Sequence, residues 1–147
     1  FRQLLPTVSG ISVEGQGMAL TVTDLNADAA PDLFMSINNG PAHVWTNQTA
    51  SSGKRIAISL RAENGNSTAV GSLVVAQPRA GRQAHEITAG SVYLSQSSAP
   101  IFVTSDPSDP VTAFQGRWPD GSTQTQSFDG TTSQLVIEKQ STVGTSR

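Results

Sequence analysis

The segment 24–32 (DLNADAAPD) has the composition of a loop that could hold a metal ion. Side chains with oxygen atoms lie at its first, third, fifth and ninth positions, and the seventh offers a backbone carbonyl. A Ca²⁺ ion takes about six to eight oxygen ligands, and a tight loop with alternate side chains pointing inward can supply them. We therefore predict a calcium site whose ligands are Asp24, Asn26, Asp28, Ala30 (through its carbonyl) and Asp32.

A second interpretation of this segment stays open, namely a polar turn whose Asp and Asn side chains bond to their own backbone. Calcium loops of this kind usually have glycine at the sixth position to make a sharp bend, and this chain has Ala29 there. Three carboxylates so close together favour a bound cation, because they would otherwise repel one another. Pro31 could hold the loop in shape without glycine.

Other candidate chemistry is weaker. Several serines follow His85 in the sequence, but no glycine-flanked nucleophile motif surrounds them, so we predict that the chain is not an enzyme. Tyr93 could stack on a sugar ring, with Gln96 and Arg117 as polar partners. The competing interpretation is that aromatic residues pack the core, which we expect for Phe114 and Trp118.

Composition excludes several classes of protein. Charged residues make up 14% of the chain and the formal net charge is −2, so no basic stripe is available for a nucleic acid. The apolar runs are too short to span a bilayer, so we expect no membrane insertion. The chain has no cysteine, which removes disulfides, thiol catalysis and thiolate metal sites.

The elements that would position these residues are short strands separated by turns. Residues Ile56, Ile58 and Leu60 alternate with more polar residues, as in a half-buried strand, and no window has sustained helical periodicity. We predict an all-β chain with strands at 18–23, 33–37, 42–46, 55–62, 72–77, 83–88, 101–104, 111–118, 123–128 and 134–138.

Two local features organise these strands. Proline presets the first position of a turn and glycine tolerates positive φ, so Pro119 and Gly121 predict a hairpin between 111–118 and 123–128. The small polar stretch 49–53 is typical of a linker. We therefore divide the chain into units 1–48 and 49–140, followed by a disordered tail at 141–147.

The first unit resembles an FG-GAP or VCBS-type repeat, the blade unit of integrin-like β-propellers. The resemblance lies in GQGMALTVTD (15–24), the acidic loop, PDLFM (31–35), NNG (38–40) and VWTN (44–47). It implies a propeller-blade-like antiparallel sheet and, since loop aspartates of this family bind Ca²⁺, the same five ligands.

The second unit resembles the UnbV (ASPIC) domain, which is found in exported bacterial proteins and in animal cartilage acidic protein. The matching runs are GSLVV (71–75), QAHEI (83–87), GSVYLSQS (90–97), RWPDG (117–121) and LVIE (135–138). The run IFVTSD (101–106) departs from the family pattern, which usually has His and Gly around a Phe. The resemblance implies no specific biochemical activity.

Taken together, these patterns predict one blade-like repeat followed by a β-sandwich or barrel-like module. We expect a non-enzymatic binding or scaffolding fragment of a larger exported protein, located outside the cell or in the periplasm, with a signal peptide upstream. Its expected partner is an extracellular protein or glycan, and a carbohydrate-binding module of a secreted enzyme is the alternative. A single blade would leave sheet edges unpaired, so we also expect edge-to-edge self-association.

Overall fold

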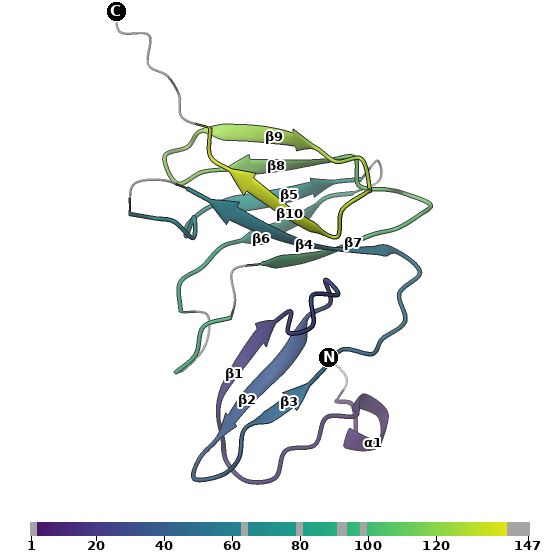
Figure 1. Ribbon diagram of the computed structural model, residues 1–147, viewed down its shortest axis with the longest axis vertical. Coiled ribbons are helices and arrows are strands. Elements are labelled where there is room, and N and C mark those ends of the chain that lie inside the picture. Colours follow the sequence, from purple (N-terminus) through teal and green to yellow (C-terminus); the bar gives the residue numbers. More distant parts are fainter. Residues whose placement is uncertain (1–2, 63–64, 79–80, 91–93, 98–99, 141–147) are drawn as a thin grey trace, which may run out of the picture.

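The computed structural model describes residues 3–62, 65–78, 81–90, 94–97 and 100–140. The chain is all-β, as predicted, and its described strands form three sheets (Figure 1). The predicted tail at 141–147 lies outside the described residues. The helical structure in the described residues is too short and too polar to cross a membrane.

The first sheet is antiparallel and has the strand order β1-β2-β3. Its register places Thr21 opposite Phe34, and Phe34 opposite Val44. The acidic loop connects the first two strands and points toward the sheet that contains β4 and β7 (Figure 1). The strand bounds are β1 (Gly17–Thr23), β2 (Asp32–Ile37) and β3 (His43–Trp45).

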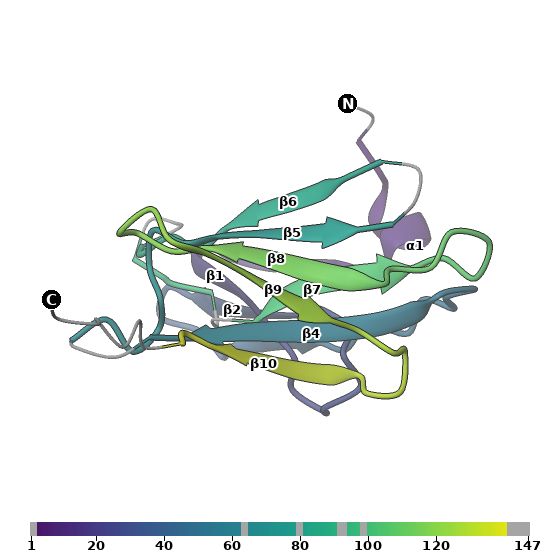
Figure 2. The same cartoon turned by 90° about the horizontal axis from the view of Figure 1, so that it is seen from above.

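The rest of the described chain forms two facing sheets, which Figure 2 shows as two layers seen edge-on. One has the order β10-β4-β7, with β10 parallel and β7 antiparallel to β4. The other is antiparallel with the order β6-β5-β8-β9. The strand bounds are β4 (Lys54–Arg61), β5 (Leu73–Gln77), β6 (Gln83–Glu86), β7 (Ile101–Ser105), β8 (Ala113–Arg117), β9 (Thr123–Ser127) and β10 (Gln134–Glu138).

The hydrophobic core lies between these two layers. Alternate residues of β4 point inward, so Ile56, Ile58 and Leu60 are buried, as the period-two pattern predicted. Phe114 and Trp118 are also buried, which confirms the core interpretation of both aromatics. The Phe114 ring meets Phe128 edge-on at a centroid distance of 5.3 Å. No described residue before Ile56 belongs to this core.

All ten predicted strands are present, each within two residues of its predicted ends. The predicted hairpin is also confirmed: β8 pairs with β9, and the amide of Gly121 donates to the Trp118 carbonyl. One element was not predicted, the single-turn helix α1 (Pro6–Ser9). Proline begins this turn and Gly10 ends it in a left-handed conformation, a local signal too short to produce periodicity.

The first sheet is held against the second unit along its β1 edge by residues 95–97. The Ser95 hydroxyl donates to the Leu20 carbonyl at 2.7 Å, and the Val22 amide donates to the Ser97 hydroxyl at 3.2 Å. The Thr21 hydroxyl donates to the Gln96 carbonyl at 3.4 Å. A segment between β6 and β7 therefore covers part of an edge that we expected to be unpaired.

Candidate functional site

The acidic loop is bent at two alanines, both with positive φ. Ala27 and Ala29 each have φ of 61°, the left-handed region that costs a residue with a Cβ roughly 1–2 kcal/mol. The bend for which glycine was expected is therefore made by alanine. Ala29 is 1% exposed, so its methyl group is packed rather than solvated.

The carboxylates of Asp24 and Asp28 accept hydrogen bonds from inside the loop. Asp24 accepts from the amides of Asp28 at 3.1 Å and Ala29 at 2.9 Å. Asp28 accepts from the Ala30 amide at 2.8 Å and from the Asn26 side-chain amide at 3.1 Å. These contacts match the turn interpretation, in which Asp and Asn side chains satisfy their own backbone.

Asp32 has a different environment, because it is fully buried. Its Oδ1 accepts from the Asn47 amide at 2.7 Å, and its Oδ2 accepts from the Leu25 amide at 2.9 Å. One carboxylate therefore joins the start of the loop to the segment after β3. Two backbone donors satisfy the two oxygens of this buried carboxyl group, and no ion pair involves it among the described residues.

The loop also contacts the second unit. Ala29 and Pro31 line a hollow of about 300 Å³ together with Arg55 of β4 and Phe102 of β7. Asn47 lies on the same hollow and donates its side-chain amide to the Pro31 carbonyl at 3.3 Å. The acidic loop is thus both the turn of the first sheet and part of the junction between the two units.

The residues predicted to bind Ca²⁺ fit the ion in donor chemistry, since carboxylate and amide oxygens are the ligands it prefers. Each oxygen of Asp24, Asp28 and Asp32 accepts one hydrogen bond, which leaves a lone pair. Their arrangement is nevertheless that of a hydrogen-bonded turn. Within the described residues, no three His, Cys, Asp or Glu side chains converge as a metal site.

Of the residues predicted to contact a sugar, the structure describes Gln96 and Arg117, and no described hydrogen bond joins these two. Tyr93 lies outside the described residues. Gln96 is exposed and contacts β1 through its carbonyl, whereas Arg117 is exposed on β8 opposite Leu73 and Thr123. Gln96 and Arg117 therefore have separate surroundings, and the sugar platform stays a prediction.

Three other aspartates, Asp106, Asp120 and Asp129, each cap an exposed turn. Hydrogen bonds from Ser108 lower the pKa of Asp106, and those from Thr131 lower the pKa of Asp129. The Lys139 ammonium, which donates to Asp120 at 2.5 Å, is the main cause of the lowered pKa of that carboxyl group. These carboxylates stabilise turns, and no hydrogen bond joins one to another.

Arg55 is a residue that the sequence reasoning did not select. It lies on β4 next to the linker, and its guanidinium donates to the Thr49 carbonyl. The available signal was a charged residue at the start of an alternating strand, two positions after the predicted linker.

The chain has a small sheet with an acidic loop, followed by a sandwich of one mixed sheet and one antiparallel sheet. This arrangement defines a modular all-β protein. The family model described as ASPIC and UnbV matches residues 62–143, more than half of the chain. The chain therefore belongs to the ASPIC and UnbV family. No curated protein is similar enough to this chain to count as a match.

Proposed function

We propose that this chain is a non-enzymatic binding or scaffolding fragment of a larger exported protein, in which the acidic loop is stabilised by Ca²⁺. The partner in this proposal is an extracellular protein or glycan. The first sheet acts as an FG-GAP or VCBS-type repeat that positions the ASPIC and UnbV module. The observation that carries the proposal is the location of the loop: it turns the first sheet and lines the junction with β4 and β7.

In this proposal, Asp24, Asn26 and Asp28 offer side-chain oxygens on the accessible side of the loop, since Asn26 and Asp28 are exposed and Asp24 is half-buried. Asp32 lies on the buried side and fixes the loop to the Asn47 amide. Ala30 contributes its carbonyl. A bound cation supplies positive charge that offsets the repulsion between carboxylates. The effect would be a more rigid junction between the two units.

The alternative function, a carbohydrate-binding module of a secreted enzyme, depends on Tyr93 with Gln96 and Arg117. It remains the second proposal because no described hydrogen bond joins Gln96 and Arg117. The two functions can be distinguished by testing the unmodified chain and the Tyr93→Ala variant on a glycan panel. A glycan that binds the unmodified chain but not the variant would favour the sugar-binding function.

The calcium proposal predicts a ligand-dependent thermal stability. At a calcium concentration several times the Kd, linkage gives a stabilisation of about 1 kcal/mol or more, which is a few degrees in Tm. The measurement is a thermal melt in millimolar calcium and again in excess chelator. Asp28→Ala should abolish the difference between the two conditions, whereas Asp129→Ala, in a turn outside the loop, should preserve it.

Only the calcium-dependent difference counts in this experiment. Asp28→Ala also removes the hydrogen bond from the Ala30 amide, so this variant should melt lower in both conditions. Equal melting of the unmodified chain in calcium and in chelator would contradict the proposal. It would leave the loop as a turn closed by its own hydrogen bonds.

A further inference from the structure

A polar pocket of about 380 Å³ lies where the acidic loop, the linker and the β4–β10 sheet meet. Its wall includes Asp28 from the loop, Thr49 and Ser51 from the linker, Arg55 from β4, and Ser133 immediately before β10. The pocket is therefore built from both units and from the segment that connects them. None of the candidate sites predicted from the sequence includes this combination.

Arg55 is the strongest recognition group in the pocket. Arg55 is half-buried, and its Nη2 donates to the Thr49 carbonyl, which holds the guanidinium in place. No other hydrogen bond or ion pair engages this guanidinium within the described residues. A guanidinium has five N–H donors in a planar fork, so most of them are free to bind a planar oxyanion.

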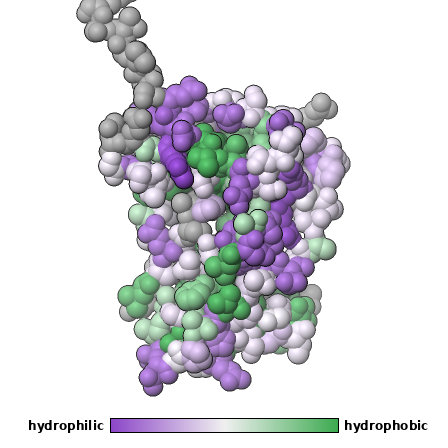
Figure 3. All heavy atoms as spheres, viewed as in Figure 1, coloured by the Kyte–Doolittle hydropathy of each residue, from purple (hydrophilic) through white to green (hydrophobic). Residues whose placement is uncertain are grey.

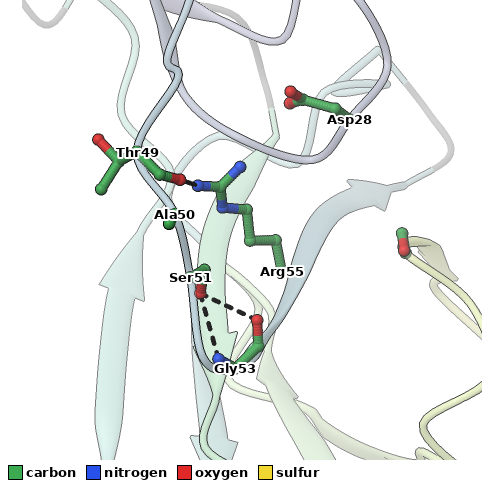
Figure 4. Close-up of a pocket in the computed structure, with 7 residues that line it drawn as sticks. Asp28, Thr49, Ala50, Ser51, Gly53 and Arg55 are labelled. Carbon is green, nitrogen blue, oxygen red and sulfur yellow. Dashed lines mark hydrogen bonds between the residues drawn. The ribbon is translucent and has the colours of Figure 1, made fainter.

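Asp28 provides a negative charge on the other side of the pocket. Figure 4 shows the Asp28 carboxylate directed toward the space above the Arg55 guanidinium, with no interaction drawn between them. The two side chains line one pocket without forming an ion pair. The Ala30 amide and the Asn26 side chain orient the Asp28 carboxylate, and its remaining lone pairs can accept further hydrogen bonds.

We propose that this junction pocket binds a small organic monocarboxylate that also carries an ammonium or hydroxyl group. The carboxylate would be held by the Arg55 fork, because a planar guanidinium matches carboxylate geometry. The ammonium or hydroxyl group would donate to Asp28. An α-amino acid and a sugar acid share this chemistry, and they are the two sources that the experiment separates.

The charge of the pocket argues against other ligands. Sulfate or phosphate would bring a dianion close to Asp28, and the repulsion would oppose the attraction of Arg55. A neutral sugar lacks the planar anion that the guanidinium binds best, and none of the residues that form this wall is aromatic. A ligand with one carboxylate and one donor complements both charged groups.

The experiment is an amide-resolved NMR titration of the full chain in excess chelator, so that it does not depend on the calcium proposal. The four probes are glycine, D-glucuronate, acetate and D-glucose. Glycine, D-glucuronate or both should cause saturable shifts at the amides of residues 49–55. Acetate should bind more weakly and D-glucose should produce no saturable shift.

Two variants test the assigned roles. Arg55→Lys keeps the charge but loses the fork, and it should weaken binding about tenfold or more. Asp28→Asn should weaken glycine binding strongly, because the ammonium group loses its anionic partner. It should weaken D-glucuronate binding less, because the remaining side-chain oxygen can still accept from a hydroxyl group. Arg61→Lys, exposed at the other end of β4, is the matched control and should change neither affinity. Thermal melts establish that each variant is folded.

Several outcomes would overturn the inference. It fails if neither glycine nor D-glucuronate gives saturable shifts, or if acetate or D-glucose binds as tightly as they do. It also fails if folded Arg55→Lys binds as tightly as the unmodified chain. Binding of glycine alone would identify an amino-acid site, and binding of D-glucuronate alone would identify a sugar-acid site.

Discussion

Ala29 illustrates how one residue combines strain with packing in the acidic loop. Its left-handed φ is unfavourable for an L-residue with a side chain, yet its methyl group is almost completely buried at the junction. Burial of one methyl group contributes a stabilisation of about 0.8 kcal/mol, comparable to the strain. Alanine can therefore replace glycine here at little net cost.

Gly53 is a second residue whose type is set by its surroundings. A Cβ at this position would lie 2.5 Å from the Ser105 carbonyl oxygen and 2.8 Å from Thr104 Cγ2. The linker thus passes so close to β7 that no side chain fits without a backbone shift.

We expect Gly53→Ala to lower the free energy of unfolding by about 1–3 kcal/mol, because the backbone must move to relieve this overlap. Urea denaturation at neutral pH would measure the change. Gly116→Ala is a suitable control, since a Cβ there would make ordinary contacts of 3.9–4.0 Å. If Gly53→Ala were as stable as the unmodified chain, the close approach of linker and β7 would be contradicted.

At the scale of elements, the segment 95–97 connects the two units by lying along β1. Two serine hydroxyls and one backbone carbonyl satisfy groups on a strand edge that would otherwise face solvent. This edge cap belongs to the connection between β6 and β7, within the residues that the family model matches. The module therefore supports the sheet that precedes it.

Replacement of both serines, Ser95→Ala with Ser97→Ala, should loosen this contact. We expect faster amide hydrogen exchange in β1, because two of its backbone groups lose their partners, and unchanged exchange in β8. Ser122→Ala, which alters an exposed turn next to β9, is the control. Unchanged protection of β1 in the double variant would show that the contact does not hold the sheet.

The strands could be predicted from sequence because alternation and turn residues are local signals. The pattern at Ile56, Ile58 and Leu60 and the turn at Gly121 both identify elements from a few neighbouring residues. The pairing of β4 with β10 could not be predicted, since residues far apart in sequence form it. The pocket at Arg55 was missed for the same reason: its wall combines three distant segments.

The acidic loop was identified correctly as a polar loop between two strands, but its internal contacts depend on backbone conformation. Side-chain spacing alone could not determine whether backbone amides or carbonyls would point at the carboxylates. Two alanines with positive φ turn the amides of Asp28, Ala29 and Ala30 toward Asp24 and Asp28.

At the scale of the whole molecule, the two units differ in how completely their large hydrophobic side chains are buried. The sandwich has a continuous core, whereas large hydrophobic side chains such as Phe34 and Val44 are exposed on the first sheet. Figure 3 shows hydrophobic residues gathered over the lower part of the molecule, where Figure 1 places this sheet. No described segment is hydrogen-bonded to the outer edge of β3.

This arrangement is the structural basis for the edge-to-edge self-association that we expect from the sequence. We expect the average mass in sedimentation equilibrium to rise with protein concentration, and Val44→Lys on the β3 edge to suppress the rise. Val8→Lys also removes an exposed apolar residue but lies in α1, so it should leave the association unchanged. A constant monomer mass, or equal suppression by both variants, would contradict association through this edge.

The parallel pairing of β10 with β4 has a consequence for how the chain folds. β4 is the central strand of its sheet, and one of its two neighbours is β10, the last strand among the described residues. During synthesis on a ribosome, the edge of β4 that pairs with β10 therefore stays unpaired until nearly all of the module has emerged. Such long-range pairing is intrinsically slow, and an apolar strand with an open side is vulnerable to aggregation meanwhile. Sheet closure at β10 would thus be a late step in folding, and premature termination before Gln134 would leave the side of β4 exposed.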